Sequence, residues 1–468
     1  MRRLCVMLML CYVANIFAQQ EFEDSATTYK YRVTLRDKKN NDYSILHPEQ
    51  YLSAKAIERR NKQGIKIDKT DLPISRQYIE TIRDCGVKII HGSKWNNTLV
   101  IATKDTTVCD ILKSYHFVTK VELVAIDKPH ESRKSDRQSL ITNEQEKHDS
   151  IMVFGKGTSQ ISILNGTHLH EMGYRGRGIT IAVVDAGFYN VDVIPALKNV
   201  NILGVRDFVN PNDDIFAEHN HGTRVLSCMA TDEKYVFVGT APEASFWLLR
   251  TEDAYTEQPV EEDNWIAAIE FADSVGVDII NSSLGYYHFD KPHQSLLHKD
   301  LNGKTHIISR TASMIAAKGM ILCTSAGNEG NDEWKKISIP GDARDVLTVG
   351  SVNKKGLISF FSSMGYSADG RVKPDVCALG TMACVLGSNG HTTYANGTSF
   401  SSPILTGMVA CLWQALPDLN AYEIMEIVRK SGNAYSTPNA KYGNGIPDFM
   451  EALEKGRKLE HKRELTIN

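Results

Sequence analysis

The chain has 468 residues, and this length favours about three domains, or one large α/β domain with a smaller one. Hydrophobic residues make up 42% of it and charged residues 23%, which excludes a wholly disordered chain. The 53 basic and 56 acidic residues give a net charge of −3, so the chain lacks the positive balance typical of nucleic-acid-binding proteins.

The first residues predict export from the cytoplasm. Arg2 and Arg3 precede an apolar run over residues 4–18, an order typical of a cleaved secretory signal, here residues 1–18. The run is shorter than the roughly 20 apolar residues of a membrane span. We therefore expect a secreted, periplasmic or cell-surface protein without a transmembrane segment after cleavage. A membrane anchor and a lipid on Cys11 are the alternatives.

Residues 19–127 predict a small α+β domain. Apolar and polar residues alternate from Tyr29 to Leu35, as in a half-buried strand. The other expected elements are helices at 51–63, 75–85 and 108–115, and strands at 87–90, 98–103 and 118–125. A polar, charged segment follows at 128–154, and this composition is typical of a linker that is open to proteolysis.

Residues 155–455 alternate apolar strands with helices. Uninterrupted apolar strands joined by helices are typical of a parallel sheet covered on both faces, so we predict an α/β domain here. The expected strands are 179–184, 245–249, 277–280, 320–323 and 346–349, and the expected helices are 265–275, 307–318, 399–415 and 421–430. A charged tail, residues 456–468, follows. In such folds the active site lies beyond the carboxyl ends of the strands.

Seven cysteines remain after the signal, too few for a disulfide-based fold. Their odd number leaves at least one free thiol, and most lie in apolar runs that predict core positions. Cys377 and Cys384 are close enough in sequence to pair, and the sequence leaves that open. No spacing of cysteines and histidines resembles a zinc site.

Three short segments place an acid, a base and a nucleophile at the ends of predicted elements. An apolar strand ends at Asp185, His221 lies in the first turn of a predicted helix, and Ser399 begins another helix. Each has an ordinary alternative: a turn after a strand, a surface histidine and a helix N-cap. Together they fit nucleophilic catalysis, because a base must take the serine proton and a carboxylate must orient and stabilise the imidazolium.

A fourth segment ends a buried strand at Gly327 and Asn328. An ordinary Gly-Asn turn explains it alone. Beside the other three, Asn328 is better interpreted as the side-chain donor of an oxyanion hole, with the backbone N–H of Ser399 as the second donor.

In this order the motifs resemble the subtilisin-like serine peptidases, the subtilases, over residues 173–453. The segments 221–225 and 397–403 carry most of the resemblance. It implies a subtilisin-like parallel sheet flanked by helices. It also implies that Asp185 orients, His221 is the base, Ser399 the nucleophile and Asn328 the oxyanion donor.

One position departs from the family pattern. Many members have threonine or serine after the aspartate, where this chain has Ala186, so one possible hydrogen bond to the carboxylate is lost. All four functional positions remain.

The resemblance also implies a substrate strand at 281–285, along which an extended peptide would pair through main-chain hydrogen bonds. The substrate-binding residues it predicts are Ser283, Leu284, Gly285, Ser325, Ala326 and Gly327. The chemistry requires no cofactor and no catalytic metal. Subtilases often hold structural calcium, for which the acidic loop 210–214 is a candidate, an ordinary solvated loop being the alternative.

Residues 19–127 resemble the inhibitor-type propeptides of secreted Bacteroidetes peptidases. This implies a zymogen that is inhibited by its own propeptide and cuts itself in the linker; a permanent accessory domain is the alternative. Together, these features predict a secreted serine endopeptidase that acts on peptides and proteins through an acyl-enzyme. A catalytically silent peptide-binding homologue and a peptide ligase are the competing hypotheses.

Overall fold

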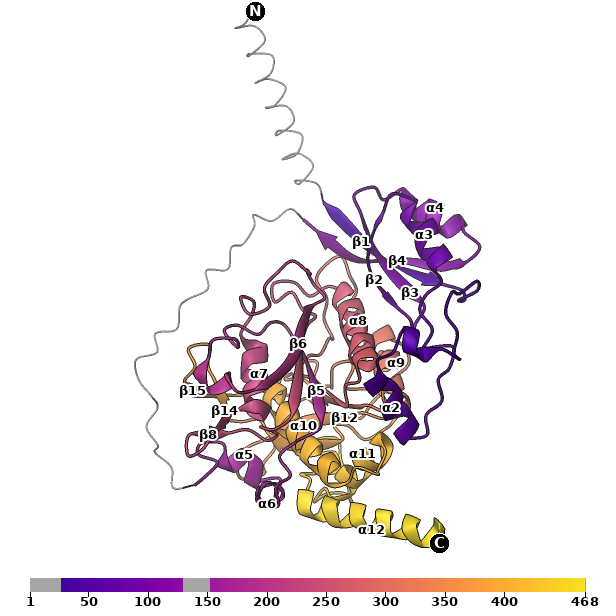
Figure 1. Ribbon diagram of the computed structural model, residues 1–468. Helices are drawn as coiled ribbons and strands as arrows, with labels where there is room; N and C mark the ends of the chain where they lie inside the picture. The colour runs from indigo at the N-terminus through magenta and orange to yellow at the C-terminus, as the bar shows by residue number, and fades with distance from the viewer. Residues whose placement is uncertain (1–26, 129–151, 468) are drawn as a thin grey trace, which may run out of the picture. The chain divides into compact units, whose positions relative to one another are not determined.

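The computed structural model describes residues 27–128 and 152–467, which form two compact units (Figure 1). The smaller unit contains residues 27–42, 73–128 and 258–260, and the larger contains 43–72, 152–257 and 261–467. The predicted signal and nearly all of the predicted linker lie outside the described residues.

The smaller unit is an antiparallel sheet with two helices. The sequence predicts its four strands and both helices, but the third helix predicted for residues 19–127, at 51–63, belongs to the larger unit. Its strands lie in the order β2-β3-β1-β4. The elements are β1 (Thr28–Leu35), β2 (Lys88–Ser93), β3 (Thr98–Thr103), β4 (Val118–Asp127), α3 (Arg76–Arg83) and α4 (Val108–Ser114). Val33, Ile82, Ile101 and Leu112 are buried in its core, so the alternating strand pattern and the helix faces converge on one apolar centre.

The larger unit is built on a seven-stranded parallel sheet in the order β13-β12-β11-β10-β5-β9-β6. The strands are β5 (Thr180–Asp185), β6 (Asn201–Asp207), β9 (Ser245–Arg250), β10 (Ile279–Ser282), β11 (Ile321–Ser325), β12 (Leu347–Val352) and β13 (Val376–Leu379). The predicted fold class is confirmed. The two strands that the sequence did not predict, β6 and β13, are the edge strands; β6 carries several exposed residues and lacks the apolar run of a buried strand.

Helices cover both faces of this sheet (Figure 1). The main ones are α7 (His221–Ala230), α8 (Val260–Val275), α9 (Ile307–Met314), α10 (Thr398–Ala415), α11 (Ala421–Lys430) and α12 (Phe449–Ile467). Successive side chains of a strand point to opposite faces of the sheet, so two neighbouring residues of β10 contact helices on opposite faces. Asn281 bonds to α10 through Ser402 and Thr406, whereas Ser282 accepts a 2.9 Å hydrogen bond from Trp265 of α8. Most of the predicted charged tail is helical, as part of α12.

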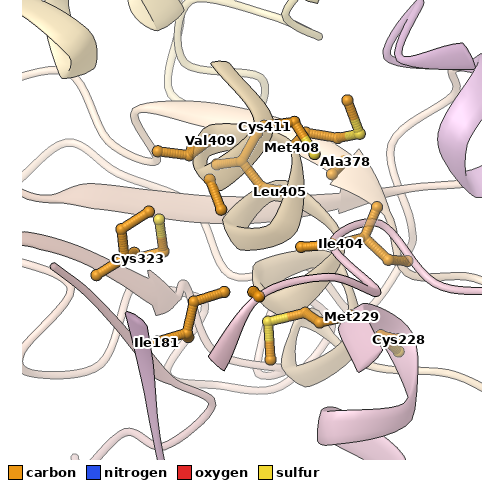
Figure 2. Packing of buried hydrophobic residues seen from close by; sticks show 14 of the residues in the cluster. Ile181, Cys228, Met229, Cys323, Ala378, Ile404, Leu405, Met408, Val409 and Cys411 are labelled. Atoms are coloured by element: carbon orange, nitrogen blue, oxygen red, sulfur yellow. The ribbon is translucent and has the colours of Figure 1, made fainter. Parts of the chain in front are cut away.

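The long helix α10 lies in the centre of the apolar core (Figure 2). Apolar side chains from three strands, from α7 and from α10 itself gather there. Labelled in the figure are Ile181, Cys228, Met229, Cys323, Ala378, Ile404, Leu405, Met408, Val409 and Cys411. This packing fixes the start of α10, where Ser399 lies, against the strand ends.

A predicted helix of the N-terminal region packs within the larger unit. Residues 43–72 include α2 (Ala54–Lys62), whose Arg60 side chain is 0% exposed. The Arg60 guanidinium lies 2.9 Å from Asp71 and 2.9 Å from Asp273, both fully buried. Arg59 contacts the same Asp273 at 2.6 Å, so two cations of α2 meet a carboxylate of α8. Such buried pairs are costly to break from one side, because the partner charge stays desolvated.

We predict that Arg60→Met lowers the free energy of unfolding of the precursor by about 3 to 5 kcal/mol, since buried carboxylates would lose a cation. Urea unfolding in a Ser399→Ala background, which prevents the predicted self-processing, measures this. Lys62→Met on the exposed side of α2 is the matched control and should change little. A loss below about 1 kcal/mol for Arg60→Met would show that these pairs contribute no more than surface pairs do.

Candidate active site

The site lies where the central parallel strands end. Asp185 is the last residue of β5, Ser282 the last of β10 and Ser325 the last of β11, and these three strands are neighbours in the sheet. Because parallel strands end at the same edge, the residues that follow them meet there.

Asp185 and His221 form the first pair. His221 begins α7, and its Nδ1 lies 2.8 Å from Asp185 Oδ1, which also accepts the Ala186 N–H at 2.8 Å. The start of α7 can lie close to the segment after β5 because residue 222 is a glycine. The Gly222 N–H bonds to the Gly187 carbonyl, and a Cβ on Gly222 would overlap that oxygen. Asp185 is fully buried, whereas the His221 side chain is 25% exposed and reaches solvent.

The environment of His221 adjusts its basicity. Burial would lower the pKa of the imidazole, but the charge and the hydrogen bond of Asp185 outweigh it and raise that pKa above its usual value. Asp185 Oδ2 is buried and has no hydrogen-bond partner in the described parts of the chain. This is the carboxylate whose extra hydrogen bond the sequence predicted to be lost at Ala186.

Ser399 is the second residue of α10, which starts after Gly397 with φ 155°, a value that favours glycine. Pro403 has no N–H to bond the carbonyl four residues earlier, so the Ser399 carbonyl is free within the helix. The Ser283 hydroxyl donates to that carbonyl at 2.8 Å. Ser399 itself is 9% exposed, and its Oγ makes a long 3.4 Å hydrogen bond to the Ser283 carbonyl.

His221 and Ser399 line the same cavity of about 340 Å³. The His221 ring also lies 6.0 Å, between centroids, from the ring of Phe400, the neighbour of Ser399. Within the described residues, Ser399 Oγ and the His221 imidazole form no hydrogen bond with each other. Catalytic hydrogen bonds of free enzymes are often long and tighten when substrate binds.

Asn328 follows β11 in the same cavity. Its Oδ1 accepts the Thr398 N–H at 2.8 Å and the Thr398 hydroxyl at 3.0 Å. A backbone N–H can only donate, so the amide oxygen must face Thr398, and the NH₂ group is left to donate on the cavity side. The Ser399 N–H, in the first turn of α10, has no partner within the helix and is likewise available to donate a hydrogen bond.

Two supporting residues were missed by the sequence analysis. Asn281 accepts hydrogen bonds from Ser402 and Thr406 and donates to Ser283 at 3.0 Å, so it ties β10 to the first turns of α10. Thr398 anchors Asn328. The cluster of small hydroxyl residues around Ser399, more than a helix cap needs, was the signal in the sequence.

Most, but not all, of the residues predicted to bind substrate line the cavity. Five of them line the cavity: Ser283, Leu284, Gly285, Ser325 and Gly327. Ala326 is fully buried, and its backbone bonds to Val349 and Ser338 instead. Carboxylates also line the cavity, among them Glu252 and Glu257, which the sequence analysis did not single out.

Comparison with protein families identifies the family of this chain. Residues 176–445 match the subtilase family, peptidase S8, and residues 30–140 match the peptidase S8 propeptide domain of Bacteroidota. The first match covers more than half of the chain. The chain belongs to the subtilase family of serine peptidases. The predicted resemblance of the N-terminal region to a Bacteroidetes propeptide is likewise confirmed.

Curated relatives of this subtilase are distant. Serine protease AprX of Bacillus subtilis (strain 168) is 28% identical over 303 residues, and the alignment spans 58% of this chain and 65% of AprX, slightly less than two thirds. Subtilisin NAT of Bacillus subtilis subsp. natto is 24% identical over 349 residues, 74% of this chain and 83% of that protein.

Solved structures share the fold. The epidermin leader peptide processing serine protease (EpiP) of Staphylococcus aureus has a TM-score of 0.62 at 18% identity, over 91% of this chain and 98% of that one. MycP1 with its N-terminal propeptide removed has a TM-score of 0.51 at 21% identity, over 63% of this subtilase and 96% of that chain.

The remaining predictions for this subtilase concern thiols, metals and membranes. All seven cysteines of the described residues are free, so Cys377 and Cys384 are not joined. In the loop predicted as a candidate calcium site, Asp213 contacts Arg250 and Asn210, and calcium binding there stays a prediction. Within residues 27–128 and 152–467 there is no group of three or more potential metal ligands. No helix in these ranges is long and apolar enough to cross a membrane.

Proposed function

We propose that this subtilase is an exported serine endopeptidase made as a self-processing zymogen. The observation that carries the proposal is the 2.8 Å pair of His221 and Asp185 in one cavity with Ser399 and Asn328. This combination of base, orienting carboxylate, nucleophile and amide donor serves acyl transfer.

Ser399 Oγ attacks the carbonyl carbon of the scissile peptide bond, and its proton passes to Nε2 of His221. Asp185 holds the proton on Nδ1, which keeps Nε2 free to act as the base, and its charge stabilises the imidazolium. The carbonyl oxygen becomes an oxyanion, to which Asn328 Nδ2 and the Ser399 N–H donate. His221 then protonates the leaving amine, and the C–N bond breaks.

Water completes the reaction. It loses a proton to His221, attacks the acyl-enzyme and releases the carboxylic acid as Ser399 regains its proton. The substrate backbone is positioned beside residues 283–285. The N–H and carbonyl of Gly285 have no backbone partner among the described residues, so they are available to an extended peptide.

The zymogen part of the proposal rests on the propeptide match at residues 30–140 and the predicted linker that follows it. Parallel sheets contain mostly non-local contacts and fold slowly, so a prefolded partner can assist and then block the cleft until it is cut. Export rests on the secretory signal predicted at residues 1–18.

Intact-mass analysis tests the proposal. The full precursor and its Ser399→Ala variant are each incubated with and without a serine-reactive fluorophosphonate. We expect the wild-type chain to lose an N-terminal piece ending within 118–158 and to take one label at Ser399, and the variant to do neither. A folded wild-type chain that stays unlabelled, even after another protease removes its N-terminal unit, would favour the silent peptide-binding hypothesis.

Asn328→Ala tests the oxyanion donor. We expect kcat to fall by about 100- to 1000-fold with little change in KM, because the donor bonds strongly only to the charge of the transition state. Steady-state kinetics of the mature enzyme on a fluorogenic peptide measures both constants.

Asn199→Ala, at an exposed asparagine, is the matched control for this substitution. An Asn328→Ala enzyme with unchanged kcat and a raised KM would instead assign Asn328 to substrate binding.

A further inference from the structure

The cavity that holds Ser399 has an acidic wall. Glu252, Asp253, Glu257 and Glu261 line one side of it, and Glu329 lines it beyond β11. The four residues of the first group follow β9 or begin α8, so they lie on the side of β5 and β9 in the sheet. None of them takes part in the acyl-transfer steps described above.

Glu252 is buried without full compensation of its charge. Only 7% of it is exposed, and its Oε1 accepts hydrogen bonds of 2.6 Å from Thr251 and from Tyr286. Its Oε2 has no hydrogen bond or ion pair to any other described residue, although the side chain lines the cavity. Burial and, to a lesser extent, the charge of Asp185 raise the pKa of Glu252 to about 7. Buried glutamates are rarely left without a partner.

The cation beside Glu252, Arg250, already forms ion pairs with other carboxylates. Arg250 lies 2.8 Å from Asp207, 3.3 Å from Asp213 and 3.1 Å from Glu218. One guanidinium therefore faces three carboxylates before Glu252 is counted. The groups around Glu252 therefore include more carboxyl groups than cations.

Glu257 adds a second carboxylate to this wall. Its main chain is fixed by two hydrogen bonds with Asp290, of 3.0 Å at its N–H and 2.8 Å at its carbonyl. The Glu257 carboxylate itself has no hydrogen bond or ion pair within the described chain, and it is half-buried. Burial, together with Glu252 and Asp290, raises the pKa of Glu257 to about 8. A positive charge between the two glutamates would stabilise both as carboxylates.

The position of the wall relative to the substrate follows from strand geometry. Tyr286, which donates to Glu252, directly follows the segment 283–285 beside which the peptide lies. Successive side chains of an extended peptide point to opposite sides. If the residue before the scissile bond faces Ser325 and Gly327, then the second and fourth residues before it face the Glu252 side.

We propose that Glu252 and Glu257 form a subsite for a positively charged group on the amino-terminal side of the scissile bond. The group is a lysine or arginine side chain at the second or fourth position, or the α-ammonium of a short substrate. This inference rests on the proposed peptidase function and adds to it a preference among substrates.

Paired fluorogenic peptides test the subsite on the mature enzyme. Two pairs are N-acetylated. Within each of these pairs, one peptide has arginine and the other its neutral isostere citrulline, at the second position before the scissile bond in one pair and at the fourth in the other. A third pair lacks basic side chains and differs in a free or acetylated N-terminus. The variant is Glu257→Gln, since the Glu257 carboxylate has no partner whose loss would unfold the chain, and exposed Glu451→Gln is the control.

We expect wild type and Glu451→Gln to prefer the positively charged member of at least one pair by about tenfold in kcat/KM, equivalent to roughly 1.4 kcal/mol. In Glu257→Gln that ratio should fall to about twofold or less. The pair that shows the preference identifies the side chain or the α-ammonium as the source of the charge.

Equal rates within every pair in the wild-type enzyme would overturn the subsite while leaving the peptidase function intact. A preference that persists in Glu257→Gln would overturn the assignment to Glu257. If no peptide is hydrolysed, neutral or charged, both the subsite and the peptidase function are overturned.

Discussion

Ser399→Ala is expected to lower kcat for peptide hydrolysis on the order of 10⁶-fold and to leave the precursor uncut. In the proposed mechanism the hydroxyl oxygen of Ser399 forms the acyl-enzyme. The nearby hydroxyls of Ser401 and Ser402 donate to Thr398 and Asn281 instead. His221→Ala should reduce the rate by a similar factor, and the double variant by little more, because the triad acts as a unit. Gel analysis of the precursor and rates on a fluorogenic peptide measure the two effects.

Ser436→Ala, at an exposed serine of the same unit, is the control for the loss of a hydroxyl. It should process itself and hydrolyse peptides as the wild-type chain does. Normal self-processing by purified Ser399→Ala would exclude Ser399 as the nucleophile, whereas loss of both activities in Ser436→Ala would indicate a general defect in folding.

Asp185→Asn is expected to lower kcat on the order of 10⁴-fold while the fold is kept. The amide has nearly the shape of the carboxylate, but it can neither stabilise the imidazolium nor keep the proton on Nδ1 of His221. The variant therefore keeps the two side chains at the 2.8 Å separation of the wild-type chain but removes the negative charge beside His221.

The same variant should shift the pH dependence of the rate. The reaction needs neutral His221, and Asp185 raises the pKa of His221, so wild-type kcat/KM falls as the pH drops through that raised pKa. In Asp185→Asn the lowering effects of burial and of the Arg224 charge on the His221 pKa remain, and the acidic limb should move to lower pH. Rates between about pH 5 and about pH 9 measure both limbs. Asp418→Asn, at an exposed aspartate, should keep the wild-type profile, and an unshifted limb in Asp185→Asn would contradict the assigned coupling.

Most of the local structure and the candidate catalytic residues could be predicted from the amino-acid sequence. Apolar runs and helical periodicity are properties of neighbouring residues, so they predicted β5, β9, β10 and the helix that starts at Ser399. The edge strand β6 was missed because its exposed residues break the apolar run that marks a buried strand. The four motif residues could be proposed from the sequence because each follows a strand or begins a helix, where the chemistry of a turn is visible in the sequence.

The contacts that support these residues could not be predicted, because they join segments that are far apart in the sequence. Ser283 bonds to Ser399, 116 positions away, and Arg60 bonds to Asp273, 213 positions away, and no local pattern carries such pairings. The amide of Asn328 is oriented by Thr398 from another element. The charge of the cavity wall likewise depends on where Arg250 is already bound. Hydrogen bonds and ion pairs depend on distance in space, which the sequence encodes only through the complete fold.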